Sequence, residues 1–507
     1  MSGVTTALDT LLEGALRAHD TRTAPAAVLA VCSPDGVLAA RAIGESRRDG
    51  AATSPDTVFR IASMTKSFLA ATALALRDEG RFDLDRDIAE LVPGTRLLWR
   101  GSVVPVTARQ LLSNRSGLPE DNAWGDRQLG ADRAEIARLA EAGLRLTAEP
   151  GERYQYSNLG MSLVGRAIER VTGGTVEAEI EGRFLEPLGM ERTCFPPERL
   201  PVGSDLAAGY RTFDDGQSFV SEPFVGSGAL ACIGGLFSTV ADVASWIAFL
   251  ASAHTAHPIR PELLSAASRR ELQRAVTPIP TGPAEPGREL DALGYGLGLV
   301  IEHDRRFGKI VQHSGGLPGF SSHMRWHADT GIGVIAFGNS DAFGAEKLAI
   351  AALSAVLAER DVPAETVRLW PETTAVLRAI DAALIAGEPV SGLTGMFAEN
   401  ALRDVPAEVR ERRLAETLTE LGPILSGQTP LAERLRASEG PANARWVIAA
   451  ERGELLAEVR LIGLPEPLVQ TLTVTAAGPD GATASGRPVG VVTRARVLLD
   501  EGAGAMR

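Results

Sequence analysis

The chain lacks several features that mark particular classes of protein. Its 507 residues contain no apolar run of about 18 residues, the length that would predict a transmembrane helix. Acidic residues outnumber basic ones and give a formal net charge of −13, whereas proteins that bind nucleic acids or anionic membranes need basic patches. We therefore expect neither a nucleic-acid partner nor a membrane partner. The sequence leaves the oligomeric state open.

Cysteines are few, and the features of a signal peptide are missing. The three cysteines, Cys32, Cys194 and Cys232, lie among apolar or small residues, which predicts buried thiols and no disulfide framework. The first twenty residues have no basic n-region and no apolar h-region. Unless a leader has been removed, this predicts a cytoplasmic protein.

Lysine is the scarcest charged residue. Of 51 basic residues only Lys66, Lys309 and Lys347 are lysines, and the others are arginines. An arginine keeps its proton at any useful pH, whereas a buried lysine can lose it. A lysine at position 66 therefore suggests that an amine is needed there for chemistry and not only for charge.

The stretch from Thr57 to Ala70 places a serine three residues before that lysine, at the start of a predicted helix. A short β-rich run ends near Ser63, and an apolar run with helical spacing follows and closes at Gly80. Residues i and i+3 share one face of a helix, so the Lys66 amine can lie beside the Ser63 hydroxyl. A serine hydroxyl needs a neighbouring base to become a nucleophile. The alternative for this tetrapeptide alone is a helix-capping serine followed by a lysine that faces solvent.

Hydrophobic periodicity predicts an α/β protein in which strands lie at both ends of the first domain. We expect a helix over 8–18, a β-hairpin from 26–32 and 37–40, and mainly helices and loops from 63 to about 287. Strands at both ends with helices between them predict one sheet that is completed by distant segments. Further helices are expected over 159–172, 239–251 and 345–357, and further strands over 296–302, 308–312, 321–326 and 331–337.

The character of the sequence changes near residue 362. Residues 373–385 and 406–421 are predicted to be helices, 446–450 and 455–461 to form a hairpin, and 469–474 to be another strand. We interpret residues 1–361 as the catalytic domain. Residues 362–507 then form a smaller C-terminal α+β accessory domain, within the usual size range of domains.

Two more short motifs follow the first along the chain. Tyr156-Ser157-Asn158 precedes the helix expected over 159–172, and His313-Ser314-Gly315 ends an expected strand. Each motif alone is better explained by structure, as a capping turn before a helix or as a histidine at the end of a strand. The ordered set of three is a much more specific signal than any one of them.

This ordered set resembles the serine β-lactamase and penicillin-binding-protein superfamily, in particular its class C-like branch of esterases, D-aminopeptidases and DD-peptidases. The segments 111–119, 234–239 and 294–298 are similar as well, so the resemblance covers about residues 10 to 360. It implies an antiparallel sheet flanked by helices, an all-helical subdomain and a serine acyl-hydrolase that needs no cofactor.

The resemblance also implies a role for each motif residue. Ser63 would attack a carbonyl to form an acyl-enzyme, and Lys66 and Tyr156 would share the work of the general base, with the ammonium lowering the pKa of the phenol. The backbone N–H groups of Ser63 and Gly316 would form the oxyanion hole. Asn158 would hold the substrate and help to fix Lys66. Ser314 and Gly315 would also contact the substrate.

His313 is the informative departure from the commonest family pattern, in which a lysine at this position helps to bind a substrate carboxylate. A histidine is mostly neutral at pH 7 and binds a carboxylate less tightly than an ammonium does. We therefore expect a hydrolase of esters or peptide amides, plausibly with D-residues. Alternatives are a penicillin-binding-protein-type thioesterase that cyclises or releases a peptide, a β-lactamase or DD-peptidase, and a binding module that has kept the fold.

No metal site is expected. His323 and His327 lie in one predicted strand, about 13 Å apart at ~3.3 Å per residue, which is too far for both to bind one ion. A polar face of the strand explains them better.

Overall fold

The computed structural model describes residues 2–18, 21–47, 49–282, 286–436, 438–477 and 495–500. The chain divides into two compact units, Met1–Val362 and Pro363–Arg507. Among the described residues, no helix combines the length and the apolar character needed to cross a membrane.

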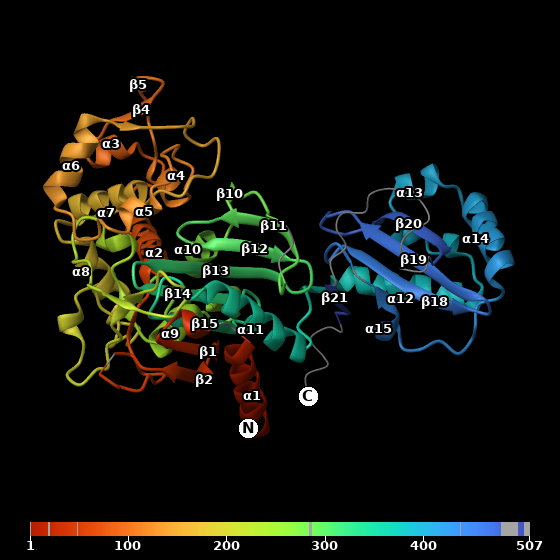
Figure 1. The fold of residues 1–507 in the computed structure, drawn as a ribbon. Coiled ribbons are helices and arrows are strands. Elements are labelled where there is room, and N and C mark those ends of the chain that lie inside the picture. Colours follow the sequence, from red (N-terminus) through yellow and green to blue (C-terminus); the bar gives the residue numbers. More distant parts are fainter. Residues whose placement is uncertain are drawn as a thin grey trace. The chain divides into compact units, whose positions relative to one another are not determined.

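The first unit is built on an antiparallel sheet of eight strands in the order β10-β11-β12-β13-β14-β15-β1-β2 (Figure 1). Its N-terminal hairpin pairs with the last strand of the unit, for example Ala30 with Ile335, so distant segments complete one sheet as predicted. The strands of this sheet are β1 Ala26–Ser33, β2 Gly36–Gly44, β10 Thr277–Pro278, β11 Leu290–Tyr295, β12 Val300–Asp304, β13 Gly308–Leu317, β14 Phe320–His327 and β15 Gly333–Gly338.

Helices cover both faces of this sheet. On one face, α1 (Ser2–Ala18) and α11 (Ala345–Glu359) bury leucines and valines against alternate residues of β1 and β15. On the other face, α9 (Val240–Ala251) packs on β1, β2 and β15. The helices expected over 8–18 and 345–357 therefore cover one apolar face of β1, and the helix expected over 239–251 covers the other; all eight residues of β1 are buried.

A mainly helical region lies between β2 and β10 in the sequence (Figure 1). The antiparallel sheet with flanking helices is confirmed, and the region expected to be all helical also contains three short sheets, β3-β9, β5-β4-β6 and β7-β8. Its elements are β3 Phe59–Arg60, α2 Thr65–Asp78, α3 Ile88–Leu91, β4 Leu97–Trp99, β5 Ser102–Val103, α4 Ala108–Leu112, α5 Asn122–Gly125, α6 Arg133–Ala142, β6 Leu144–Arg145, α7 Asn158–Thr172, α8 Val176–Ile180, β7 Gly209–Arg211, β8 Val220–Glu222, β9 Phe237–Ser238 and α10 Ala266–Leu272.

Two strand predictions differ from the structure. The strand expected over 296–302 begins only at Val300, because Gly296 and Gly298 form a tight turn in which a Cβ on Gly298 would lie 2.5 Å from the Lys66 carbonyl oxygen. The residues before this turn form β11, which was not predicted. In addition, β13 continues to Leu317, so the His313 motif lies inside the strand and not at its end.

The second unit contains a four-stranded antiparallel sheet in the order β17-β18-β19-β20 and a parallel pair, β16 with β21. The predicted hairpin is present, with Ala450 opposite Gly453, and Trp446 lies in the core with apolar residues of α12. The elements are β16 Glu365–Arg368, α12 Pro371–Ala386, α13 Glu399–Asp404, α14 Ala407–Leu421, α15 Leu431–Arg434, β17 Leu435–Arg436, β18 Asn443–Ala450, β19 Gly453–Leu461, β20 Val469–Ala476 and β21 Ala495–Leu498.

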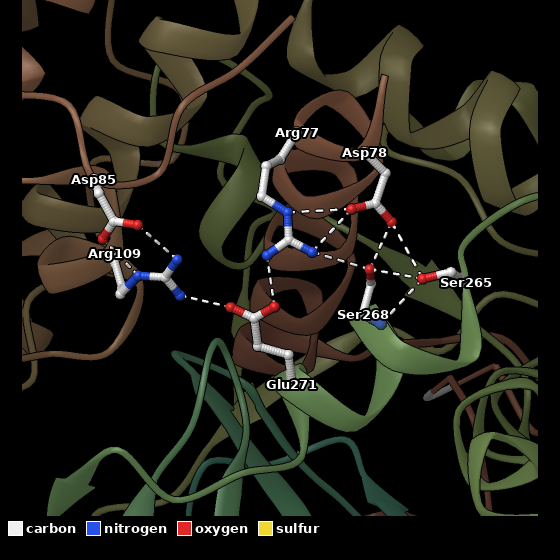
Figure 2. A network of polar contacts seen from close by, with 7 residues as sticks. All are labelled: Arg77, Asp78, Asp85, Arg109, Ser265, Ser268 and Glu271. Carbon is white, nitrogen blue, oxygen red and sulfur yellow. Dashed lines mark hydrogen bonds and ion pairs between the residues drawn. The ribbon is translucent and has the colours of Figure 1, made fainter. Parts of the chain in front are cut away.

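A polar network fixes the C-terminal end of α2 to its neighbours (Figure 2). Glu271 of α10 accepts hydrogen bonds from Arg77 of α2 and from Arg109 of α4, at 2.5 and 2.6 Å. Arg109 in turn holds Asp85, and Asp78 accepts a hydrogen bond from Ser268. Because α2 begins at Thr65, just after the turn that contains Ser63, this network holds the helix next to the candidate nucleophile.

Replacing Glu271 with glutamine should lower the free energy of unfolding by about 1 to 2 kcal/mol, because two partly buried guanidinium groups lose their shared carboxylate. Burial raises the pKa of Glu271, but Arg77 and Arg109 together hold it below its usual value. The stabilisation should therefore be complete above about pH 5 and disappear as the pH falls through the lowered pKa. Chemical denaturation at pH 7 and pH 4 measures both effects.

The matched control is Glu90→Gln, which breaks an exposed ion pair between Glu90 and Arg86 in the same unit. Such pairs contribute about 0.5 kcal/mol or less. Equal losses in the two variants would show that the Glu271 network does not stabilise the end of α2.

Candidate active site

Ser63 lies in a 3-10 turn, Ala62–Met64, between β3 and α2. Ala62 has a φ of 49°, in the left-handed region that costs a residue with a side chain about 1 kcal/mol or more. Neighbouring hydrogen bonds hold this conformation: Thr65 Oγ1 donates to the Ala62 carbonyl at 2.7 Å and accepts from the Leu236 N–H. Ser63, which lies in this turn, is only 6% exposed.

Lys66 is fully buried one turn further on, and its Nζ lies 2.9 Å from Ser63 Oγ. The same Nζ lies 2.9 Å from the carbonyl oxygen of Ile233. Burial lowers the pKa of the Lys66 ammonium to about 7, although Asp126, Asp121 and Cys232 act in the opposite direction. The alternative of a lysine that faces solvent is therefore wrong. In its neutral form the amine donates to Ile233 and offers its lone pair to the Ser63 hydroxyl.

Tyr156 completes this group. Its ring centroid lies 4.9 Å from Lys66 Nζ, and the Ser63 side chain is near enough to its phenol to affect the pKa of that group. Burial raises the pKa of Tyr156 well above its ordinary value, and the effect of Ser63 only partly offsets this. The expectation that the ammonium of Lys66 would lower the phenol pKa is therefore wrong, because burial raises this pKa and the nearby carboxylates of Asp126 and Asp121 act in the same direction. At neutral pH the phenol keeps its proton.

His313 of β13 is buried and hydrogen-bonded on both ring nitrogens. Nδ1 contacts the Ser314 carbonyl oxygen, which only accepts, so Nδ1 carries the proton. Nε2 then accepts from the hydroxyl of Tyr295 at 3.0 Å. Burial and the nearby charge of Lys66 lower the His313 pKa to about 3, although the bond to Ser314 raises it. His313 is thus a neutral group at physiological pH, as the sequence suggested.

The two glycines after Ser314 differ in their surroundings. A Cβ on Gly315 would lie 2.3 Å from the Ile61 carbonyl oxygen and 3.1 Å from Ala62 Cβ, so β13 runs directly against the turn that carries Ser63. A Cβ on Gly316 would meet nothing within 4 Å. Gly316 is the next residue of β13 after this close contact. Its N–H is therefore at the position expected for the second oxyanion donor.

Asn158 and its neighbours are held by residues at the start of α5. Asp121 accepts hydrogen bonds from the N–H groups of Asn158 and Leu159, at 2.6 and 3.0 Å, and from the Ser157 hydroxyl at 2.9 Å. The side-chain amide of Asn158 donates to Asn122 Oδ1. Asn158 was expected to help fix Lys66, whereas in this structure the second hydrogen bond of Lys66 Nζ is made to the carbonyl of Ile233.

The site opens into a pocket of about 400 Å³. Its charged groups are Glu120, Glu346 and Arg288, and Arg288 is ion-paired with the buried Glu302 at 2.9 Å and with Glu346 at 3.7 Å. The pocket therefore carries an excess of negative charge. The residues that line it are Ser63, Glu120, Asn122, Tyr154, Tyr156, Ile279, Arg288, Leu293, Tyr295, Val300, Gln312, His313, Ser314, Gly316 and Glu346.

The two histidines of β14 are both buried and make separate contacts. His323 Nδ1 lies 2.9 Å from the hydroxyl of Ser314, and His327 Nδ1 lies 2.9 Å from the hydroxyl of Thr330. Within the described ranges, no group of three or more histidine, cysteine or acidic side chains is placed to hold a metal ion.

Sequence reasoning missed several residues of the site. Tyr295 belongs to the Gly-Tyr-Gly-Leu-Gly segment that was noted only as similar text, and its contact with His313 depends on how β11 pairs beside β12. Glu120 and Asp121 follow directly after the similar segment 111–119 and carried no signal of their own. Asp126, which follows α5, acts on the pKa of Lys66 only because of how this segment folds.

Comparison with known proteins adds a family match. The family model described as Beta-lactamase matches residues 11–358 of the chain. Protein flp of Staphylococcus aureus (strain MRSA252) is 29% identical over 287 residues, which cover 56% of this chain and 53% of that protein. The chain thus spans about half the length of the curated relatives it matches.

Solved structures show the same architecture. The octameric penicillin-binding protein homologue from Pyrococcus abyssi aligns with a TM-score of 0.58 and 22% identity over 92% of this chain and 95% of that one, which concerns the fold alone. The D-amino acid amidase from Ochrobactrum anthropi SV3, complexed with L-phenylalanine amide, aligns with a TM-score of 0.53 and 26% identity. That alignment covers 70% of this chain and 99% of the amidase.

Proposed function

The chain belongs to the Beta-lactamase family, and on that premise we propose that it is a serine hydrolase that forms an acyl-enzyme on Ser63. The observation that carries this proposal is the contact of 2.9 Å between Lys66 Nζ and Ser63 Oγ in a site where burial brings the lysine pKa to about 7. A surface lysine would be an ammonium with no lone pair to offer. We assign the chemistry to the first unit and propose an accessory role for the second.

Lys66 is the general base of this mechanism and Tyr156 the proton donor. As Ser63 Oγ attacks the substrate carbonyl, its proton passes to Lys66 Nζ, and the Oγ–C bond forms. The raised pKa of Tyr156 keeps its proton in place, so the phenol can give it to the departing amine or alkoxide. The Lys66 ammonium then gives its proton to the Tyr156 phenolate, which restores both groups. In deacylation water attacks the acyl carbonyl and gives its proton to Lys66, and the Lys66 ammonium protonates Ser63 Oγ as the acid leaves.

The developing oxyanion is held by the N–H groups of Ser63 and Gly316. The close packing of Gly315 against Ile61 supports this assignment, because it brings β13 next to the Ser63 turn. Losing one such donor typically costs about 3 kcal/mol of transition-state stabilisation. In this mechanism His313 remains neutral and holds the hydroxyl of Tyr295 at the wall of the pocket.

The charges of the pocket support substrates that carry an amine and not a carboxylate. Glu120 lies close enough to Tyr154 to raise the pKa of that phenol further, after the larger effect of burial. The only arginine among the residues lining this described pocket, Arg288, is ion-paired with Glu302 and Glu346, and His313 is uncharged. We therefore propose small aminoacyl amides and esters as substrates. The similarity to a D-amino acid amidase supports the D configuration.

A substrate panel tests this proposal. Phenylalanine amide in its D and L forms, N-acetyl-D-phenylalanine amide, a p-nitrophenyl ester, a chromogenic cephalosporin and a peptidyl thioester are each incubated with the full chain. We expect turnover of the ester and of the D-amide, and a loss of about tenfold or more when acetylation removes the ammonium charge. Product analysis by chromatography and mass spectrometry follows each reaction.

Other outcomes of the panel would contradict the proposal. Preferred turnover of the cephalosporin would identify a β-lactamase, and a cyclic product from the thioester would identify a peptide cyclase. Absence of any acyl-enzyme and of any turnover would favour a binding module that has kept the fold.

A further inference from the structure

The base of this mechanism becomes an ammonium in a place without solvent. Lys66 is fully buried, so the positive charge that it gains when Ser63 loses its proton needs a counter-charge from the protein. We propose that Asp121 and Asp126 are positioning residues that supply this counter-charge, so that their carboxylates stabilise the ammonium formed on Lys66 during acylation. The inference rests on the proposed function in that it takes Lys66 as the base.

Asp121 is fixed toward the site by hydrogen bonds from another element. It receives the N–H groups of Asn158 and Leu159 and the hydroxyl of Ser157, all at the start of α7. A carboxylate at the N-terminus of a helix is further stabilised by the helix dipole. Asp121 therefore anchors its own segment to the residues that follow Tyr156, and its charge acts on Lys66 from a fixed position.

Asp126 is the less expected member of the pair. The residue is 9% exposed, and its Oδ1 has no hydrogen-bond partner among the described residues. The preceding Gly125 packs so closely on Asn158 that a Cβ there would lie 2.6 Å from Asn158 Cβ. This contact holds the end of α5 against the start of α7. A buried carboxylate that lacks a full set of partners is costly, so an opposite charge nearby is the simplest reason for keeping it.

The charges that face one another here come from several elements. Burial raises the pKa of Asp126 to about 6, and Lys66 and Arg127 lower it while Asp121 and Glu120 raise it. Asp121 behaves similarly: burial raises its pKa, and Lys66 together with the hydrogen bonds from α7 opposes this.

Lys66 itself is surrounded by neutral as well as charged groups. Ser63 and Tyr156 are in contact with it and neutral, Cys232 of the turn Ala231–Ile233 is a buried thiol whose pKa burial raises to about 12, and His313 of β13 is neutral. At neutral pH, Asp121 and Asp126 are thus the negative charges that act on Lys66.

Removing one carboxylate should make Lys66 harder to protonate. Its pKa then falls, the acid limb of the pH–rate profile for acylation moves to lower pH, and the rate at the plateau decreases because a weaker base takes the proton from Ser63. A role of Asp126 in folding alone would lower the amount of active protein without moving the acid limb.

The scarcity of lysine makes a direct measurement possible. With lysine labelled at Cε by ¹³C, the full chain should give three side-chain signals, and Lys66→Arg identifies that of Lys66. We expect Asp126→Asn to lower the pKa of Lys66 by about one unit. The acid limb of the pH–rate profile for labelling by a fluorophosphonate probe should move to lower pH by the same amount. Asp121→Asn should act in the same direction, and Asp126→Ser serves if the asparagine variant does not fold.

A control separates charge from structure. Asp132→Asn changes the capping residue of α6, which removes a carboxylate that does not act on Lys66. This variant should not shift the Lys66 titration. An unchanged or raised Lys66 pKa in the folded Asp126→Asn variant would overturn the inference while leaving the acyl-enzyme on Ser63 intact. Failure of the proposed function would instead appear as probe labelling that persists in Ser63→Ala.

Discussion

Replacing Ser63 with alanine should remove all covalent labelling by a fluorophosphonate probe, and replacing Lys66 with arginine should slow acylation by about three orders of magnitude or more. Arginine keeps a positive charge at position 66 but never offers a lone pair. Because the hydroxyl and the amine act as a unit, the double variant should be no slower than the more impaired single variant. Intact-mass spectrometry and stopped-flow measurement of p-nitrophenol release follow the acylation step.

The pH dependence provides an internal check on this result. In the wild type, acylation should rise with pH through the Lys66 pKa, near 7, because the neutral amine is the active form. His313 should add no limb in this range, since its pKa lies near 3. Lys347→Arg is the matched control, because this lysine is exposed and far from the motif in sequence. Acylation by Lys66→Arg at the wild-type rate would remove Lys66 from the mechanism.

Replacing Gly315 with alanine should damage both stability and activity. The new methyl group would lie 2.3 Å from the backbone oxygen of Ile61 and 2.1 Å from Ser322 Oγ, and a backbone atom cannot move without displacing the Ser63 turn. Overpacking of this kind costs about 3 kcal/mol. A displacement of about 1 Å between β13 and Ser63 would lower acylation by about 100-fold. Chemical denaturation and probe labelling measure the two effects separately.

The neighbouring glycine is the natural comparison. Gly316→Ala adds the same methyl group where nothing lies within 4 Å, so its free energy of unfolding should change by about 0.5 kcal/mol or less. If both variants are equally stable, β13 does not pack against the Ser63 turn as closely as the structure shows.

Much of the fold could be predicted from local patterns. The helix over 159–172 begins at Asn158 after a Ser157 cap and ends before a left-handed Gly173, and the helix over 239–251 is capped by Thr239. The resemblance to the serine β-lactamase and penicillin-binding-protein superfamily is confirmed by the family match. These features depend on residues close together in the sequence, or on ordered motifs.

What could not be predicted depends on contacts between distant segments. The partner of Tyr295 is set by the pairing of β11 and β12. Gly296 and Gly298 form a turn where a strand had been expected, and Gly298 lies against α2. The pKa of Tyr156 was predicted in the wrong direction because the sequence shows which charges are near but not how much solvent is excluded. The effect of Asp126 on the Lys66 pKa likewise depends on the packing of α5 on α7, which no local pattern shows.

The burial of Lys66 has a practical consequence for handling the protein. Reagents that couple primary amines to beads or surfaces reach side chains that water reaches, and of the three lysines it is Lys347 that is exposed, whereas Lys66 is sealed inside. Attachment through lysine side chains would therefore favour Lys347 of α11 and spare the reactive nitrogen of Lys66.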